Sequence, residues 1–237
     1  MAENASDPRI NIIENGPYVV KGSVPLFRLQ IVVDENDECT GYREMCHYPD
    51  KKSYNLCRCG ESNRRPYCDG THTHTGFTSV CNGADSQRFA DHIKSIKGSH
   101  VELLDAENFC IEARFCERSQ GIWDLTRHSF ESPENCGLAV EEAELCPAGR
   151  LVMLNEKGDE MEPDLEPSIA IIEDPSKHAS SALWVRGKIP IYGCDGVQFE
   201  LRNRVTLCRC GESSNKPFCD AGHYYSSAHF DDGCIEE

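Results

Sequence analysis

Residues 56–62 read Leu-Cys-Arg-Cys-Gly-Glu-Ser, and residues 207–213 repeat the same seven letters. Further along, residues 66–69 (Pro-Tyr-Cys-Asp) recur as residues 217–220 (Pro-Phe-Cys-Asp), and a histidine stands three residues after the aspartate in both copies. Both copies therefore have the spacing Cys-x-Cys-x8-Cys-x3-His. Self-similarity of this kind indicates an internal duplication, and it organises the rest of the chain.

The duplication extends upstream of the cysteines. Residues 18–26 match residues 183–191, so the repeated unit is a strand followed by a ligand loop. The first copy is longer than the second by 14 residues, and the excess lies within residues 34–50, which we expect to form a surface loop. We expect three regions: repeat 1 at residues 16–83, an inserted domain at residues 84–180, and repeat 2 at residues 181–237.

Three thiols and one imidazole within sixteen residues form a four-ligand metal site with soft donors. Zinc and an iron-sulfur cluster are the two possibilities. Zinc knuckles usually separate their first two ligands by two to four residues, whereas a Cys-x-Cys pair suits two ligands on one iron of a binuclear cluster. The candidate ligands are Cys57, Cys59, Cys68 and His72 in repeat 1, and Cys208, Cys210, Cys219 and His223 in repeat 2.

The pattern Cys-x-Cys-x2-Ser-x3-Pro-x-Cys-Asp-Gly-Thr-His at residues 57–72 resembles that of the CDGSH iron-sulfur domain family, the mitoNEET-like proteins. Repeat 2 departs from it at Ala221-Gly222 but keeps the ligand spacing. The resemblance implies one [2Fe-2S] cluster per motif on a small β-sandwich built from two motif-bearing units. Tandem members form that pair within one chain, so we expect a monomer with an internal pseudo-dyad. Four residues are expected to support the ligands, the aspartates by orienting the loop and the serines by donating to a sulfur: Ser62, Asp69, Ser213 and Asp220.

A second constellation lies between the repeats. Cys110 and Cys116 have the gap of a ferredoxin loop with Ala113 in place of the middle cysteine, and Cys146-Pro147 is similar to the pair that supplies the last ligand. This segment resembles the divergent single-cluster ferredoxin domain. Three cysteines imply a [3Fe-4S] cluster, or a [4Fe-4S] cluster with one non-cysteine ligand. Cys136 is about 15 Å from Cys146 along a continuous helix, which is too far to share a cluster.

The overall fold class predicted is α+β and mostly β: an intramolecular CDGSH pseudo-dimer β-sandwich with an inserted ferredoxin-like α+β module. A helix is expected to begin at Ser132-Pro133-Glu134 and to end at Cys146-Pro147. The other elements expected in the insertion are a helix at residues 85–96, strands at 101–104, 151–154 and 169–172, and a loop at 156–167.

Composition limits the possible partners. The chain has 237 residues and a net charge of −16, which disfavours nucleic acid and anionic membranes and favours a redox protein partner with a basic docking face. No apolar run is long enough to span a membrane, and a polar start to the chain predicts a cytoplasmic protein. In that compartment the 15 cysteines are expected to be ligands or thiols rather than disulfides. Six are expected to be thiols outside the clusters: Cys39, Cys46, Cys81, Cys136, Cys194 and Cys234.

No Ser-His-Asp arrangement, phosphate loop or dinucleotide fingerprint occurs in the sequence, so we expect an electron carrier rather than an enzyme. Two alternatives remain open. The protein is an iron-sulfur cluster donor or redox sensor in the first, and a structural zinc protein in the second.

Overall fold

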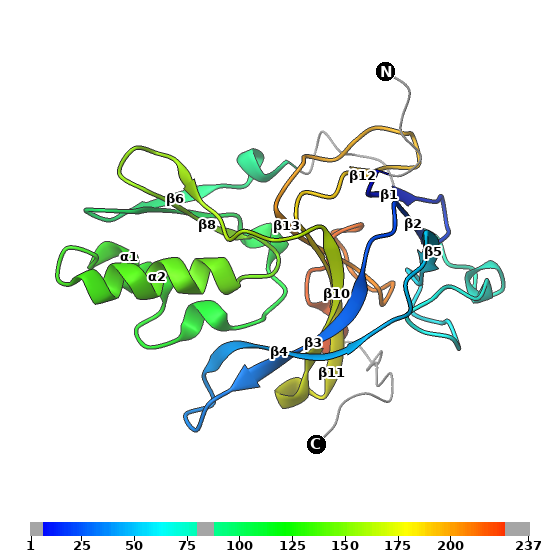
Figure 1. Ribbon diagram of the computed structural model, residues 1–237, viewed down its shortest axis with the longest axis horizontal. Helices are drawn as coiled ribbons and strands as arrows, with labels where there is room; N and C mark the ends of the chain where they lie inside the picture. The colour runs from blue at the N-terminus through cyan, green and yellow to red at the C-terminus, as the bar shows by residue number, and fades with distance from the viewer. Residues whose placement is uncertain (1–6, 80–87, 226–237) are drawn as a thin grey trace.

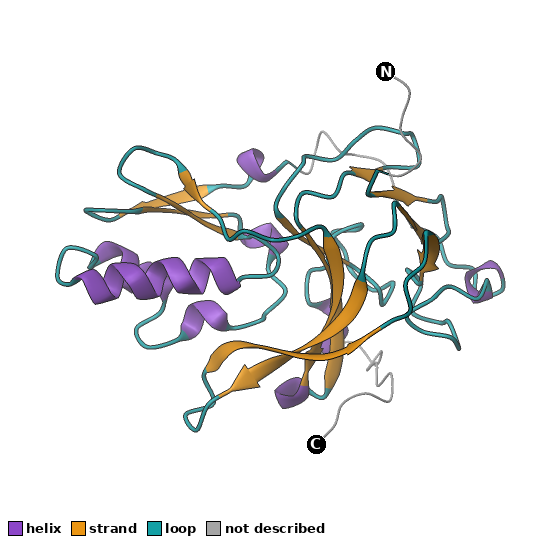
Figure 2. Cartoon of the chain, in the orientation of Figure 1, coloured by secondary structure: helices purple, strands orange, loops and turns teal. Residues whose placement is uncertain are grey.

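The computed structural model describes residues 7–79 and 88–225, and in these ranges the chain forms three sheets (Figures 1 and 2). The first sheet has the strand order β12-β1-β2-β5, the second β13-β11-β10-β3-β4, and the third β6-β7-β8-β9. The strands of the first two sheets are β1 (Arg9–Ile12), β2 (Tyr18–Lys21), β3 (Leu26–Val33), β4 (Cys39–His47), β5 (Ser53–Leu56), β10 (Ser168–Asp174), β11 (Ala179–Arg186), β12 (Ile191–Tyr192) and β13 (Arg204–Leu207).

The two repeats pair within one chain by exchanging strands. In repeat 1, β2 pairs antiparallel with β1 and β5; in repeat 2, β11 pairs antiparallel with β10 and β13. However, β12 follows β11 in the chain but lies parallel to β1, and β3 follows β2 but lies parallel to β10. Each sheet therefore contains a strand from the other repeat, as an intramolecular pseudo-dimer requires. Strands β1 and β10, although they precede the expected repeat starts at residues 16 and 181, belong to this architecture.

Matching glycines end the equivalent strands β2 and β11. Gly22 has φ 88° and Gly187 has φ 71°, in the left-handed region that glycine adopts without strain. A Cβ at Gly22 would lie 2.5 Å from backbone atoms of Asp7 and Pro8, and one at Gly187 would lie 2.5 Å from Leu165 and Pro167. Each glycine thus lets the chain turn tightly against another segment as it crosses to the opposite sheet.

The core runs between these two sheets. All seven residues of β10 are buried, and so are the first seven of β11, because both strands lie inside the second sheet and are covered on both faces. Isoleucines 169, 171 and 172 have no more than 1% of their surface exposed. The predicted strand at 169–172 is therefore confirmed and is longer than expected.

The expected surface loop at residues 34–50 is wrong. Residues 39–47 form β4, which pairs antiparallel with β3 and lengthens the second sheet. Pairing at the sheet edge satisfies the backbone groups that β3 would otherwise expose. The side chain of Cys39 is 1% exposed in the core, whereas Cys46 is exposed on the same strand.

The inserted segment forms the third sheet, with two helices packed against it (Figure 2). Its elements are β6 (Lys94–Lys97), β7 (Glu102–Asp105), α1 (Ile122–Arg127), α2 (Pro133–Leu145), β8 (Leu151–Leu154) and β9 (Glu160–Met161). The start of α2 is as predicted, because Ser132 Oγ accepts a hydrogen bond from the Asn135 N–H at 3.2 Å and Pro133 takes the first helical position. The predicted strands at 101–104 and 151–154 are confirmed.

Two predictions in this segment are wrong. Residues 88–96 form a short 3-10 turn at Phe89–Asp91 and then strand β6 instead of a helix; residues 85–87 lie outside the described ranges. Pairing of β6 with β7 overrides the helical spacing of Phe89, Ile93 and Ile96. The expected loop at 156–167 contains β9, which pairs with β8. Within residues 7–79 and 88–225, no helix is long and apolar enough to cross a membrane.

Candidate metal centres

The four candidate ligands of repeat 1 lie in two close pairs. Cys57 and Cys59 follow β5 directly, and their sulfurs are 3.7 Å apart. Cys68 Sγ lies 3.4 Å from Nδ1 of His72, which stands on a short 3-10 turn at Thr71–Thr73. The loop therefore presents a Cys-Cys pair and a Cys-His pair.

Repeat 2 has the same arrangement but is more deeply buried. The sulfurs of Cys208 and Cys210 are 3.6 Å apart, and Cys219 Sγ lies 3.8 Å from Nδ1 of His223. His223 is 2% exposed, whereas His72 is only partly buried. Ala221 adopts the left-handed conformation (φ 63°) that Gly70 adopts in repeat 1 (φ 90°), so the departure from the family pattern leaves the path of the loop intact.

Backbone amides donate to one sulfur in each loop. The Glu61 N–H donates to Cys59 Sγ at 3.5 Å, and the Glu212 N–H donates to Cys210 Sγ at 3.4 Å. Such donors stabilise the thiolate form, which is the form that binds metal.

Each sulfur pair shares its protons unequally. The hydrogen bond from Cys59 lowers the pKa of Cys57 to about 6, and the equivalent bond from Cys210 lowers the pKa of Cys208 to about 6. The second thiol of each pair has its pKa raised, because it would have to ionise beside a thiolate in a buried site. The first thiol of each pair therefore ionises more readily than the second.

The supporting residues orient the loops through the backbone. Asp69 accepts hydrogen bonds from the N–H groups of Asn63 (2.9 Å) and Thr71 (3.1 Å) and from the Thr71 hydroxyl, and these bonds hold its pKa below the ordinary value. Asp220 likewise accepts hydrogen bonds from the N–H groups of Ser214 and Gly222. These bonds lower its pKa although burial opposes the shift.

The serines do not donate to sulfur as expected. Ser62 Oγ donates to the Tyr67 carbonyl at 2.6 Å, and Ser213 Oγ donates to the Phe218 carbonyl at 2.7 Å. Each bond closes the loop between the first two cysteines and the third, because the accepting carbonyl belongs to the residue before the third cysteine.

The two ligand loops touch each other. A Cβ on Gly211 would lie 2.7 Å from the Cys59 carbonyl oxygen, which is too close for any residue but glycine. Gly211 has φ 80°, which glycine also accommodates best. The backbone of one candidate site is therefore in direct contact with the backbone of the other.

The third constellation also comes together. Cys110, Cys116 and Cys146 line one cavity of about 70 Å³ in the inserted segment. The Glu112 N–H donates to Cys110 Sγ at 3.4 Å, as in the repeats. Glu112 (φ 57°) and Arg114 (φ 63°) adopt left-handed conformations that bend the loop around the cavity. Burial raises the pKa of the Cys110 and Cys116 thiols.

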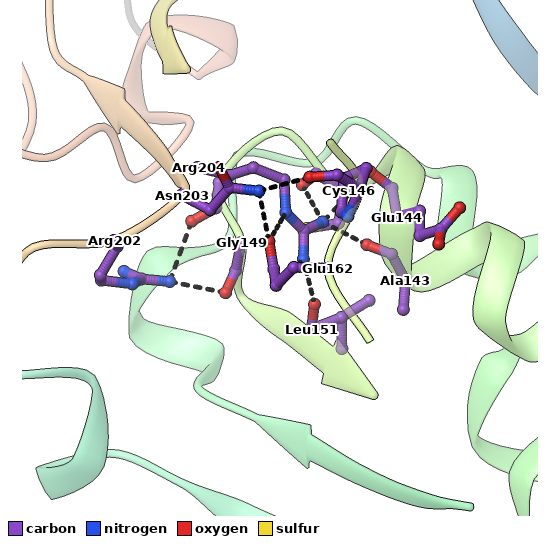
Figure 3. A network of polar contacts seen from close by, with 11 residues as sticks. Ala143, Glu144, Cys146, Gly149, Leu151, Glu162, Arg202, Asn203 and Arg204 are labelled. Carbon is purple, nitrogen blue, oxygen red and sulfur yellow. Dashed lines mark hydrogen bonds and ion pairs between the residues drawn. The ribbon is translucent and has the colours of Figure 1, made fainter. Parts of the chain in front are cut away.

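Arg204 fastens Cys146 to repeat 2 (Figure 3). Its side chain comes from β13 and is 1% exposed. It donates to the carbonyls of Cys146 (2.8 Å), Leu151 (3.1 Å) and Ala143 and forms an ion pair with Glu162. A cation at the last carbonyls of α2 also complements the helix dipole. No local sequence pattern marked this arginine.

Each repeat offers four soft donors in two pairs, with a backbone amide that donates to a sulfur. The residues present therefore fit the binuclear clusters that the family implies. Within residues 7–79 and 88–225, no three Cys, His, Asp or Glu side chains converge as ligands of a single metal ion do.

The remaining cysteines are not equivalent. Cys39, Cys46 and Cys136 are free thiols, and Cys136 packs beside the core of the inserted segment. Cys194 is disulfide-bonded, so the expectation of a free thiol there is wrong. Cys81 and Cys234 lie outside the described residues.

Comparison with known families agrees with the geometry. The model of the iron-binding zinc finger of CDGSH type matches residues 15–73 and 181–224, and the model of the divergent 4Fe-4S mono-cluster matches residues 96–156. No curated protein and no solved structure matches the chain. The two matched regions of the first kind contain all eight candidate ligands of the repeats, and the second contains Cys110, Cys116 and Cys146. The chain is thus a CDGSH iron-sulfur domain protein, with a divergent 4Fe-4S mono-cluster domain inserted between its two CDGSH regions.

Proposed function

We propose that this protein carries single electrons through three iron-sulfur sites. Each CDGSH repeat holds one [2Fe-2S] cluster through three cysteines and one histidine. The inserted domain holds a third cluster, [3Fe-4S] or [4Fe-4S], through Cys110, Cys116 and Cys146. One observation carries the proposal: the repeat 2 site is in contact with both of the others.

The contact toward repeat 1 is made by the backbone, between Gly211 and Cys59. The contact toward the inserted domain is made by two rings. Phe218, next to Cys219, packs edge-on against Phe109, next to Cys110, with centroids 5.1 Å apart. Electron tunnelling becomes faster as centres approach, so this continuity favours electron transfer over storage or a purely structural role.

Bound clusters would supply one-electron redox chemistry; the residues of the chain determine how each cluster is held. Amides of Glu61, Glu212 and Glu112 donate to ligand sulfurs and favour added negative charge. Burial of Cys208, Cys210 and Cys219 keeps water from the repeat 2 site. The ligand thiols must remain reduced until a cluster binds, so cluster insertion requires reducing conditions.

The test is anaerobic reduction of the holo protein with dithionite, followed by reoxidation with a one-electron acceptor such as cytochrome c. We expect reversible bleaching of the visible absorption and about three electrons delivered per chain. Cys208→Ala, which disrupts the site touching both others, is expected to slow delivery from the remaining sites. A colourless protein with bound zinc, or clusters that dithionite does not reduce, contradicts the proposal.

Cluster donation is the second candidate, and the exposure of His72 favours it at repeat 1. A histidine in contact with water is more easily displaced from its metal by water or by a ligand of an acceptor protein than a buried one. Holo protein mixed with an apo-ferredoxin would then lose one cluster from repeat 1 and keep that of repeat 2. Transfer of electrons without movement of iron would exclude this candidate.

A further inference from the structure

The pseudo-symmetry of the repeats relates two surfaces that have different neighbours. From residue 51 to the end of the ligand loop, equivalent residues are 151 positions apart, as Cys57 and Cys208 are. On repeat 2, the face around Cys219 is where the inserted domain packs. Arg202, Arg204, Asn215 and Phe218 all contact that domain from this face.

These contacts place the inserted domain's ligand loop against the ligand loop of repeat 2. The Arg202 guanidinium lies 4.8 Å from the ring centroid of Phe109 and donates to the Gly149 carbonyl at 2.6 Å (Figure 3). The Asn215 amide donates to the Asn108 carbonyl at 2.8 Å. On this face, repeat 2 thus supplies cations and an aromatic ring beside a candidate cluster ligand. The inserted domain supplies the carbonyls or carboxylate opposite them.

The same positions on repeat 1 form an open groove of about 270 Å³. Its lining includes Lys51, Asn55, Arg64, Tyr67 and Cys68. Lys51 is equivalent to Arg202, Arg64 to Asn215, Tyr67 to Phe218 and Cys68 to Cys219. Lys51, Asn55 and Arg64 are exposed, and the ligand Cys68 is only partly buried, whereas Cys219 is fully buried.

The groove is basic although the chain is strongly acidic. Lys51 and Arg64 are exposed along it, none of the residues that line it is acidic, and the Lys51 ammonium lies 3.7 Å from the centroid of the Tyr67 ring. The chain as a whole has a net charge of −16. Charges within a contact act at distances shorter than the Debye length, about 8 Å at physiological salt, so the local sign determines which partner fits here.

We propose that this groove is the docking site for a separate acidic, ferredoxin-like redox protein. This docking role rests on the electron-transfer function proposed above. The partner takes on repeat 1 the place that the inserted domain takes on repeat 2. It presents carboxylates or carbonyls to Lys51 and Arg64 and packs an aromatic side chain against Tyr67, near Cys68. At this groove the partner's docking face is therefore acidic, opposite to the basic face that the net charge alone suggests.

The experiment measures the second-order rate constant of electron exchange between the holo protein and a reduced plant-type [2Fe-2S] ferredoxin, an acidic probe, by stopped flow. The test variant is Lys51→Glu with Arg64→Glu. The control is Lys97→Glu with Lys157→Glu, which changes the net charge equally on the sheet of the inserted domain, at the opposite end of the molecule from β5 (Figure 1).

We expect the rate constant of the groove variant to fall about tenfold or more relative to that of the control. Iron content and reduction by dithionite should be the same in both. Equal rate constants for the two variants would overturn the proposal, and so would a groove variant whose reaction with basic cytochrome c slows by the same factor. If dithionite does not reduce the unmodified protein, the electron-transfer function is contradicted instead. Failure of that function and failure of the docking role therefore give different results.

Discussion

The hydroxyl of Tyr18 donates a hydrogen bond of 2.7 Å to the carbonyl oxygen of Cys208, across 190 residues of sequence. Tyr18 belongs to repeat 1 and is fully buried, while Cys208 is the first candidate ligand of repeat 2. The same hydroxyl lies 3.2 Å from the Pro217 carbonyl. One side chain thus ties both arms of the repeat 2 ligand loop to the opposite repeat. The equivalent residue in repeat 2 is Leu183, which has no hydroxyl, so this tie is made in one direction only.

Tyr18→Phe should destabilise the protein by about 1–2 kcal/mol, because it leaves a buried carbonyl without its donor. It should also speed the loss of the repeat 2 cluster to a chelator while leaving repeat 1 unchanged. Urea denaturation and the decay of visible absorption measure the two effects. Tyr192→Phe, a half-buried tyrosine on β12, is the control and should change stability by less than about 0.5 kcal/mol.

Cys110→Ala with Cys146→Ala should remove the cluster of the inserted domain and leave about four irons per chain in the two repeats. The ligand pairs of the repeats do not use either cysteine. Iron and sulfide analysis checks the number, with Cys136→Ala as a control that should lose no iron. Two irons or fewer, in a variant with unchanged circular dichroism, would contradict the assignment of a cluster to each repeat.

The third cluster is expected to be [3Fe-4S], because three cysteines line its cavity and Ala113 replaces the fourth. An oxidised [3Fe-4S] cluster is paramagnetic, whereas oxidised [2Fe-2S] and [4Fe-4S] clusters are silent. The protein as isolated should give an electron paramagnetic resonance signal that disappears on reduction and is absent from Cys146→Ala. A fully loaded protein without that signal would indicate a four-iron cluster with a non-cysteine ligand.

Arg204→Met should destabilise the protein by about 3–5 kcal/mol, since Glu162 and several buried carbonyls lose their cation. The cluster held by Cys146 should be lost before those of the repeats. Chemical denaturation and the paramagnetic signal follow the two effects. The control is Arg127→Met, because the ion pair of Arg127 with Asp124 is exposed on α1. This variant should lower the free energy of unfolding by less than about 1 kcal/mol. Equal losses in the two variants would show that Arg204 does not position the ligand.

Glu142 predicts a pH dependence of stability. Its side chain is buried without a hydrogen-bond partner among the described residues, and burial raises its pKa to about 8. The unfolded chain releases this proton near pH 4.5, so the folded state binds more protons between pH 4.5 and 8, and stability falls as the pH rises through that range. Glu142→Gln should remove the fall and be more stable at pH 9 by on the order of 3 kcal/mol. Thermal unfolding at pH 5 and pH 9 tests this, and the exposed Glu141→Gln should behave like the unmodified protein.

Two kinds of information in the sequence proved sufficient. The duplicated ligand spacing indicated the family and the eight candidate ligands of the repeats, and the ferredoxin-like gap indicated the three cysteines between them, because ligand chemistry depends on residue type and short spacing. The cap at Ser132 located α2, because capping involves neighbouring residues. Helical spacing at Phe89, Ile93 and Ile96 was misleading, since pairing of β6 with β7 outweighed it.

Tertiary structure decided the relations between segments far apart in the chain. These relations join residues separated by tens to hundreds of positions. They are the exchange of β3 and β12 between sheets, the hydrogen bond from Tyr18 to Cys208 and the hydrogen bond from Arg204 to the Cys146 carbonyl. Such contacts have no local signature, because they depend on which buried surfaces meet when the two repeats pack on each other and the inserted domain packs beside them. For the same physical reason the sequence shows two nearly identical ligand loops, while the folded protein buries one and leaves the other beside an open groove.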